Sequence, residues 1–219
     1  MKIFLDTANI PAIKQLIPTG LIDGVTTNPT HLSKEGNDPK KQVLEICALL
    51  PHGEISVEVT AMEPDTLYKQ AKAIAHLSDN IVVKIPCHKN YYAVIKKLVA
   101  EKIPINVTLV FSLTQGLMMS KLGVRYISPF MGRLDDSGGD SIVLLKQLRN
   151  MIDRYNYSTD ILAASVRDIE HFNGAIVAGA DVITVSPELL EKVCAHSLTD
   201  QGMAQFLHDW KKLNITQFP

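Results

Sequence analysis

One lysine of this chain lies in a strongly apolar segment, where a charged side chain is costly. Lys84 is the one charged residue of IVVKIP, residues 81–86. Burial disfavours the charged form of an amine, so we expect desolvation to lower the pKa of Lys84 and to provide neutral amine near neutral pH. A neutral amine can attack a ketone or aldehyde to form a Schiff base, which stabilises a carbanion on the adjacent carbon. The alternative is a lysine that simply reaches solvent from a strand end.

Seven further apolar runs each end in a polar or chemically distinctive residue. These residues are Asp6 (KIFLD), Asn28 (GVTTNP), Glu58 (ISVEVT), Thr108 (INVTLVF), Phe130 (YISPFMGR), Ser165 (ILAASVR) and Thr184 (DVITVS). Eight strands with chemistry at one end are typical of eight-stranded α/β barrel enzymes, whose sites lie at the C-terminal ends of the strands.

Helical patterns separate these runs and predict a parallel sheet. We expect helices at 10–16, 39–50, 64–77, 91–100, 112–122, 141–155, 168–178, 187–195 and 199–213. An open doubly wound sheet is the alternative. Strand side chains alternate, so Ser56 shares a face with Glu58, and Val82 shares a face with Lys84. Helices would bury that charged face in an open sheet, whereas a closed barrel turns it towards a central pocket.

We therefore predict the α/β class, as a (β/α)8 TIM barrel in one domain over 1–219 with an additional C-terminal helix. The apolar residues of that helix, 199–213, need a partner. Two partners are possible: the underside of its own barrel or a neighbouring subunit. We expect the second, and therefore a homo-oligomer.

The composition limits the function classes. The net charge of −1 gives no reason to expect nucleic acid or a membrane surface as partner. No apolar run approaches the length of a membrane span.

The three cysteines form no CxxC motif and point to a reducing, cytoplasmic setting. The seven histidines form no metal-ligand spacing, so they are interpreted as scattered surface or core residues, and no metal site is predicted.

Several of the polar residues have both a structural and a chemical interpretation. Asp6 either caps the first helix or serves as a general acid or base beside Lys84. Glu58, if it faces the interior, needs a partner, and Lys84 on the next strand is the obvious one. Asn106 lies within a strand, where Asn is uncommon, and this is a mild indication of a ligand contact. Thr108 fits either ordinary strand propensity or the site.

Two arginines follow neighbouring strands at the same end of the predicted barrel. Arg133 comes shortly after the sixth strand, and Arg167 comes two residues after Ser165. They are either surface residues or a clamp for a phosphate group. Phosphate sites in such barrels usually lie on the last two loops, so this clamp would lie one unit earlier.

Seven segments in order resemble the transaldolases, in the short-chain branch that also contains the fructose-6-phosphate aldolases. These segments are FLDTAN, GVTTNPT, VVKIP, NVTLVFS, SPFMGRLDD, ASVRD and LTDQGMAQFLHDW, and they span the chain from Lys2 to about Trp210. The resemblance implies a lysine-dependent aldol transfer between sugar phosphates without metal or organic cofactor. It also implies a decameric assembly.

The resemblance implies roles for eleven residues of this chain. Lys84 forms the Schiff base, Asp6 handles the proton of the hydroxyl next to the breaking bond, and Glu58 and Thr108 hold a proton-shuttling water. Asn28, Asn106, Ser128 and Phe130 contact the dihydroxyacetone unit, and Arg133, Ser165 and Arg167 bind the phosphate.

Two positions separate the branches of this family. The aldolases tend to carry Gln in place of Glu58 and Tyr in place of Phe130, and a Tyr hydroxyl can position water that protonates the enamine. Phe130 cannot donate a hydrogen bond. The sequence therefore predicts a transaldolase that transfers a dihydroxyacetone unit from fructose 6-phosphate or sedoheptulose 7-phosphate to an aldose phosphate in the pentose-phosphate pathway. An aldolase that releases dihydroxyacetone and a non-catalytic sugar-phosphate-binding barrel are the alternatives.

Overall fold

Eight parallel strands close into a barrel in the computed structural model, which describes residues 1–36 and 38–213. The strands follow one another around the barrel in chain order, and the last pairs with the first. They are β1 (Lys2–Asp6), β2 (Gly24–Thr26), β3 (Glu54–Glu58), β4 (Ile81–Pro86), β5 (Ile105–Val110), β6 (Tyr126–Pro129), β7 (Asp160–Ala163) and β8 (Val182–Val185). The predicted closed barrel is confirmed and the open sheet is wrong. Residues 37 and 214–219 of the predicted single domain lie outside the described residues.

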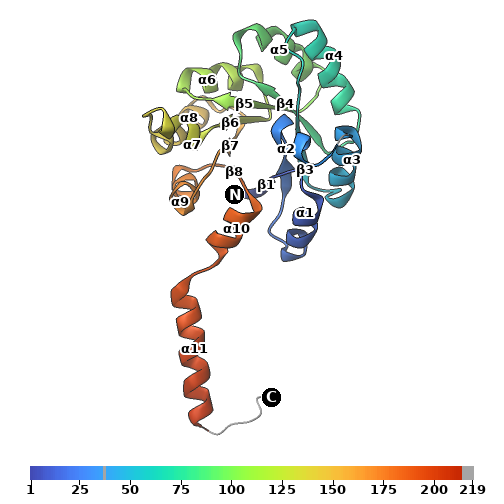
Figure 1. The fold of residues 1–219 in the computed structure, drawn as a ribbon. Helices are drawn as coiled ribbons and strands as arrows, with labels where there is room; N and C mark the ends of the chain where they lie inside the picture. Colours follow the sequence, from blue (N-terminus) through green and yellow to red (C-terminus); the bar gives the residue numbers. More distant parts are fainter. Residues whose placement is uncertain (37, 214–219) are drawn as a thin grey trace.

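Helices surround the barrel, except for the last one, which extends away from it (Figure 1). They are α1 (Ile10–Leu16), α2 (Pro29–Lys34), α3 (Pro39–Leu49), α4 (Pro64–Ala75), α5 (Tyr92–Ala100), α6 (Leu113–Leu122), α7 (Met131–Asp136), α8 (Ser141–Tyr155), α9 (Ile169–Ala178), α10 (Pro187–Cys194) and α11 (Ser197–Lys212), with the short 3-10 helices η1 (Ile17–Thr19) and η2 (Lys89–Tyr91). The short helices α2 and α7 were not expected from the sequence. Both begin within the loops that follow strands, which is where a barrel builds its site.

Local sequence determines where the helices begin and end. Seven helices start after a residue whose side-chain oxygen accepts a backbone N–H of the first turn. These capping residues are Asn9, Asn28, Asp38, Ser112, Asp140, Asp168 and Ser186. Because Asn9 caps α1, the interpretation of Asp6 as that cap is wrong. Gly123, Asn156 and Gly179 end α6, α8 and α9 in the left-handed conformation.

An apolar layer of side chains lies inside the barrel. It consists of Phe4, Val82, Tyr126, Leu162, Ala164 and Val182. Strand alternation places Phe4 below Asp6 and Val82 below Lys84, as predicted. Gly24 leaves room for this layer, because a Cβ there would lie 2.3 Å from the Glu54 carbonyl oxygen and 2.8 Å from the Phe4 ring. The barrel is thus a packed core with its opening at one end.

Helix α11 extends away from the barrel as a separate arm (Figure 1). It begins two residues earlier than predicted, because the His196 side chain accepts the Leu198 N–H at its start. It ends at Lys212. None of its residues is buried. The possibility that it packs beneath its own barrel is therefore wrong.

No helix within residues 1–36 and 38–213 is long and apolar enough to cross a membrane.

Candidate active site

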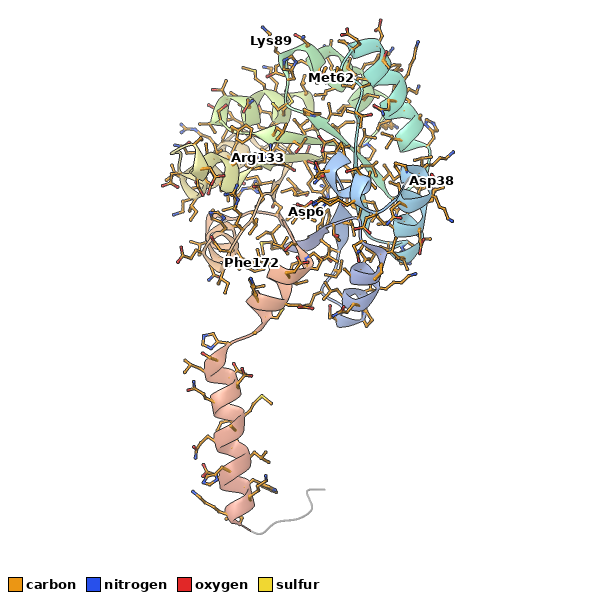
Figure 2. The ribbon with its side chains drawn as sticks, in the orientation of Figure 1. Asp6, Asp38, Met62, Lys89, Arg133 and Phe172 are labelled. Atoms are coloured by element: carbon orange, nitrogen blue, oxygen red, sulfur yellow. The ribbon has the colours of Figure 1, made fainter. Side chains whose placement is uncertain are left out.

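Two adjoining cavities open at the C-terminal ends of the strands. The inner one, about 140 Å³, and the outer one, about 350 Å³, share Asn28, Lys84, Phe130 and Arg133. Figure 2 shows Asp6 and Arg133 within the ring of helices, and Asp38 and Lys89 at its outer edge. The structure thus brings most of the sequence-predicted residues to one place.

Lys84 and Glu58 form a buried ion pair on neighbouring strands. The Lys84 Nζ lies 3.1 Å from Glu58 Oε2, and the two side chains are only 6% and 14% exposed. Lys84 Nζ also donates a hydrogen bond of 3.1 Å to the Thr27 carbonyl oxygen. The two residues are in register on β3 and β4, so strand pairing alone holds them side by side. The expected pairing of Glu58 with Lys84 is confirmed, and the interpretation of Lys84 as a solvent-exposed lysine is wrong.

Asp6 lines the inner cavity and has three polar neighbours. Its Oδ1 accepts a hydrogen bond of 2.9 Å from Thr26 and lies 3.6 Å from His31 Nε2. Burial raises the pKa of the Asp6 carboxyl, but the interaction with His31, the charge of Lys84 and the Thr26 hydrogen bond outweigh burial. The net effect is a pKa below the ordinary value, so the carboxylate is the stable form near neutral pH.

A hydrogen-bonded chain of side chains lies beside the lysine. Ser128 Oγ donates to Asn106 Oδ1 at 2.6 Å, and Asn106 Nδ2 donates to Ser56 Oγ at 3.1 Å. All three residues are buried. Their mutual bonds fix the Asn106 amide orientation, and both Asn106 and Ser128 line the inner cavity.

Asn28 combines a structural task with a place in the site. Its Oδ1 accepts the His31 N–H at 2.9 Å and so caps α2, while the residue lines both cavities. Strand β2 ends at Thr26, two residues before the predicted end. Asn28 therefore begins the loop helix that covers the mouth of the barrel.

Thr108 occupies a distorted part of β5. The pairing of β5 with β6 shifts register between Val107 and Val110, and Leu109 adopts a left-handed φ of 58°. This conformation is unfavourable for a residue with a branched side chain. The Thr108 hydroxyl is buried without a hydrogen-bond partner among the described residues, and it lines the outer cavity with Glu58. Buried polar side-chain atoms are normally satisfied, and this hydroxyl is one of three exceptions among the described residues.

Phe130 and Arg133 border both cavities. The Arg133 guanidinium lies 5.3 Å from the centre of the Phe130 ring, and Phe111 packs edge-on against that ring at 6.2 Å. Arg133 forms no ion pair within the described residues. It is thus a positive group facing the cavity, held by its contact with the aromatic face.

Arg167 lies apart from the cavities, in contrast to Arg133. Its guanidinium forms a two-pronged pair with the Asp136 carboxylate and is about half exposed. Its stem crosses Gly132, where a Cβ would lie 2.4 Å from Arg167 Nε. Ser165 lines the inner cavity with a left-handed φ of 56°. The structure therefore brings Ser165 and Arg133, but not Arg167, to the two cavities.

The site contains residues that sequence reasoning did not include. Thr26, Leu162 and Ala164 line the inner cavity, and His31 lines the outer one. Thr184, which the sequence predicted at the end of the last strand, also lines the inner cavity. Strand alternation could have predicted Thr26, which follows Gly24 on the interior face. His31 could have been found only from the Asn-Pro signal that starts α2. Cys87 and His88, which directly follow β4, line neither of these cavities.

These features define a class of protein. A buried lysine paired with a carboxylate at the open end of a (β/α)8 barrel belongs to the barrel enzymes. Within the described residues no group of three or more His, Cys, Asp or Glu side chains is arranged to hold a metal ion.

The chain belongs to the transaldolase/fructose-6-phosphate aldolase family, whose model matches residues 3–217. It is 48% identical to a probable transaldolase of Lactiplantibacillus plantarum, over 99% of this chain and 100% of that protein. It is 44% identical to probable transaldolase 2 of Listeria monocytogenes, over 96% of each chain. It is 45% identical to a probable transaldolase of Streptococcus pyogenes, over 96% and 98% of the two chains. These similarities support an enzyme of the transaldolase type. They confirm the resemblance that the sequence motifs indicated.

Proposed function

We propose that this enzyme transfers a dihydroxyacetone unit from a ketose phosphate to an aldose phosphate through a Schiff base on Lys84. The donors would be fructose 6-phosphate or sedoheptulose 7-phosphate, and the acceptors glyceraldehyde 3-phosphate or erythrose 4-phosphate. The observation that carries the proposal is the buried Lys84–Glu58 pair facing a cavity lined with hydroxyl and amide groups.

Schiff-base formation needs proton transfers at the lysine nitrogen. Lys84 Nζ attacks the substrate C2 carbonyl, and the resulting carbinolamine loses water to give the iminium. Glu58, 3.1 Å from Nζ, accepts the ammonium proton and returns it to the departing hydroxyl through a water held with Thr108. The partnerless Thr108 hydroxyl in the same cavity supports this assignment.

Bond cleavage then uses Asp6. Its carboxylate accepts the C4 hydroxyl proton, the C3–C4 electron pair moves into the iminium, and the aldose phosphate leaves with a C4 aldehyde. The lowered pKa of Asp6 supports this role, because a base must be unprotonated when substrate arrives. The attached unit remains as an enamine, whose hydroxyls contact Asn28, Asn106 and Ser128.

The phosphate end of the substrate would bind at Arg133 and Ser165. Arg133 forms no ion pair among the described residues and borders both cavities. Arg167 would join this phosphate site after its guanidinium leaves Asp136, a pair that is exposed and therefore contributes little.

The enamine then waits for an acceptor aldehyde. Phe130 lines the cavity, and its ring cannot orient water towards the enamine carbon. Transfer is therefore favoured over release of free dihydroxyacetone, and the reaction belongs to the pentose-phosphate pathway of the cytoplasm.

A coupled assay tests this function. Purified protein is given fructose 6-phosphate with and without erythrose 4-phosphate, and glyceraldehyde 3-phosphate is measured. Product that requires erythrose 4-phosphate supports the transferase. Product without the acceptor assigns the chain to the aldolases. A folded protein that forms neither product nor a borohydride-reducible adduct would be a sugar-phosphate-binding barrel.

We also propose that the enzyme is a homo-oligomer in which α11 packs on a second copy. Apolar side chains along this arm are largely exposed, among them Leu198, Met203, Phe206 and Leu207. Contiguous exposed apolar side chains often mark a surface that binds another protein. Light scattering of the purified protein gives the mass; a monomer at micromolar concentration would contradict the proposal, and a decamer would fit the family.

A further inference from the structure

His31 is a polar residue at the mouth of the barrel. Neither the sequence analysis nor the proposed reaction assigns it a role. It lies in the first turn of α2, lines the outer cavity and is about 29% exposed. Its Nε2 lies 3.6 Å from Asp6 Oδ1. Asn28 Oδ1 accepts its backbone N–H at 2.9 Å, so a residue of the site holds the backbone at this position.

The proposed reaction leaves one proton to be stored between its two halves. Asp6 takes the C4 hydroxyl proton when the first aldose leaves. The same proton is needed when the enamine attacks the second aldehyde, because the new C4 oxygen forms as an alkoxide. In the proposed reaction Asp6 is the group that takes this proton, and His31 is the imidazole in contact with it. An imidazole changes charge readily between about pH 5 and 8.

We propose that His31 is the second proton-carrying group of the site, which accepts the C4 hydroxyl proton from Asp6 and returns it during transfer. In the first half-reaction the proton moves from the substrate hydroxyl to Asp6 and then to His31 Nε2, which becomes an imidazolium paired with the Asp6 carboxylate. In the second half-reaction it moves back through Asp6 to the new C4 oxygen. No proton is gained or lost over the cycle, and no oxidant or other reactant is required.

The geometry permits this relay. The distance of 3.6 Å is slightly longer than a hydrogen bond, and such contacts tighten when substrate closes a site. The relay requires the tautomer with hydrogen on Nδ1, so that Nε2 is free to accept. His31 also lines the outer cavity together with Glu58 and Lys84.

Other charged groups surround the ring. The cavity that His31 lines also has Glu58 of β3, Lys84 of β4 and Arg133 of α7 along its wall. The carboxylate of Asp6 in β1 lies 3.6 Å from the His31 ring. On its own helix and at the following residue lie Lys34 and Glu35, and Glu35 is bonded to the Asn9 amide. Helix α3, which packs on α2, begins with Lys40 and Lys41 after Pro39. Among the described residues, Asp6 provides the one carboxylate within 4.0 Å of the His31 ring nitrogens.

The test is the pH dependence of turnover in His31→Gln and His31→Leu. The glutamine keeps a hydrogen bond to Asp6 without carrying a proton, and the leucine removes both. His52→Gln, the same change in a histidine at the opposite end of the barrel, is the matched control. Circular dichroism and thermal unfolding verify the fold of each variant. The inference rests on the proposed function, so wild-type transfer and its borohydride-reducible adduct are measured alongside.

The relay predicts that wild-type kcat falls as pH decreases between about pH 8 and 5. In both His31 variants this decline moves at least about one pH unit lower, kcat at pH 7 falls about tenfold and KM changes little. His52→Gln behaves like the wild type. A normal wild-type transfer with superimposable pH profiles in the His31 variants overturns the relay, as does a higher KM with unchanged kcat. Absence of transfer and adduct in the wild type rejects the proposed function itself.

Discussion

Strand β3 carries a glutamate at each end, and the two carboxylates have opposite surroundings. Glu54, at the closed end, binds Lys2 at 2.8 Å and Arg125 at 3.4 Å and accepts the Tyr126 hydroxyl. Arg125 in turn binds Asp160 at 2.7 Å. The network is partly exposed, its charges are matched and Tyr126 forms part of the apolar layer above it.

Glu58, at the open end, has the opposite arrangement. Among the described residues its one cationic partner is Lys84, the pair is nearly buried, and a cavity lies against it. The Thr108 hydroxyl beside it has no partner among the described residues. In one barrel, matched charges close the bottom and contribute stability, while sparsely matched charges at the top are available for chemistry. Each prediction below tests that division.

The largest effect is expected for Lys84→Met. The transfer rate should fall by roughly 10⁴-fold or more, because no other amine replaces the nucleophile. The variant should also lose about 3–5 kcal/mol of unfolding free energy, since Glu58 is left as an unpaired buried carboxylate. The double variant Lys84→Met/Glu58→Gln is the control: it should regain stability but no activity. Retention of more than about 1% of the wild-type rate would contradict this account.

Asp6→Asn should lower the transfer rate by about 10²- to 10³-fold, the usual contribution of a positioned base. The asparagine oxygen still accepts the Thr26 hydrogen bond, so the fold should survive. Fructose 6-phosphate with borohydride should still label Lys84, because Asp6 acts after the Schiff base forms. Loss of labelling in a folded variant would place Asp6 earlier in the reaction.

Glutamine at either end of β3 should separate stability from activity. Glu54→Gln should reduce the unfolding free energy by about 1–3 kcal/mol and leave kcat/KM unchanged. Glu58→Gln should lower kcat about tenfold or more. Urea unfolding and the coupled assay measure both. Equal effects of the two substitutions on activity would remove the distinction between the ends.

The pH dependence of the Glu54 contribution follows from its surroundings. Burial raises the pKa of Glu54, but hydrogen bonds from Lys2 and Tyr126 and the charge of Arg125 outweigh burial and lower it. A lowered folded-state pKa stabilises the fold above the unfolded value of about 4.3, and the stabilisation disappears as pH falls through the folded value. The stability difference between wild type and Glu54→Gln should therefore shrink below about pH 4.

The smallest expected effect is in Phe130→Tyr. A hydroxyl at this position can orient water towards the enamine, so release of dihydroxyacetone without acceptor should rise several-fold, a change of about 1 kcal/mol in the barrier. Phe111→Tyr, in the ring that packs against Phe130, is the control for added polarity. No gain in free dihydroxyacetone from Phe130→Tyr would count against the role of Phe130 in protecting the enamine.

The sequence predicted the barrel and the Lys84–Glu58 pair because both follow from short-range periodicity. Alternation along β3 and β4 determines which side chains face inward, and parallel register then places Glu58 beside Lys84. The predicted strand ends were less accurate. Lys84 lies two residues inside β4, and Asn28 lies beyond β2 as a helix cap.

What the sequence did not predict depends on tertiary contacts or uncommon backbone conformations. Leu109 and Ser165 adopt positive φ values that residue type alone does not indicate. His31 and Asp6 are 25 positions apart and meet only after α2 folds over the mouth. The pairing of Arg167 with Asp136 likewise depends on how α7 packs against the loop that follows β7. Gly132 of α7 makes room there for the arginine stem.

The most direct test of the central claim is borohydride reduction of the enzyme with fructose 6-phosphate, followed by peptide mass analysis. The account predicts a three-carbon adduct on the peptide that contains Lys84 in the wild type, an uncleaved six-carbon sugar-phosphate adduct on that peptide in Asp6→Asn, and no adduct in Lys84→Met. An active enzyme that yields no adduct, or an adduct on a different lysine, would contradict the account.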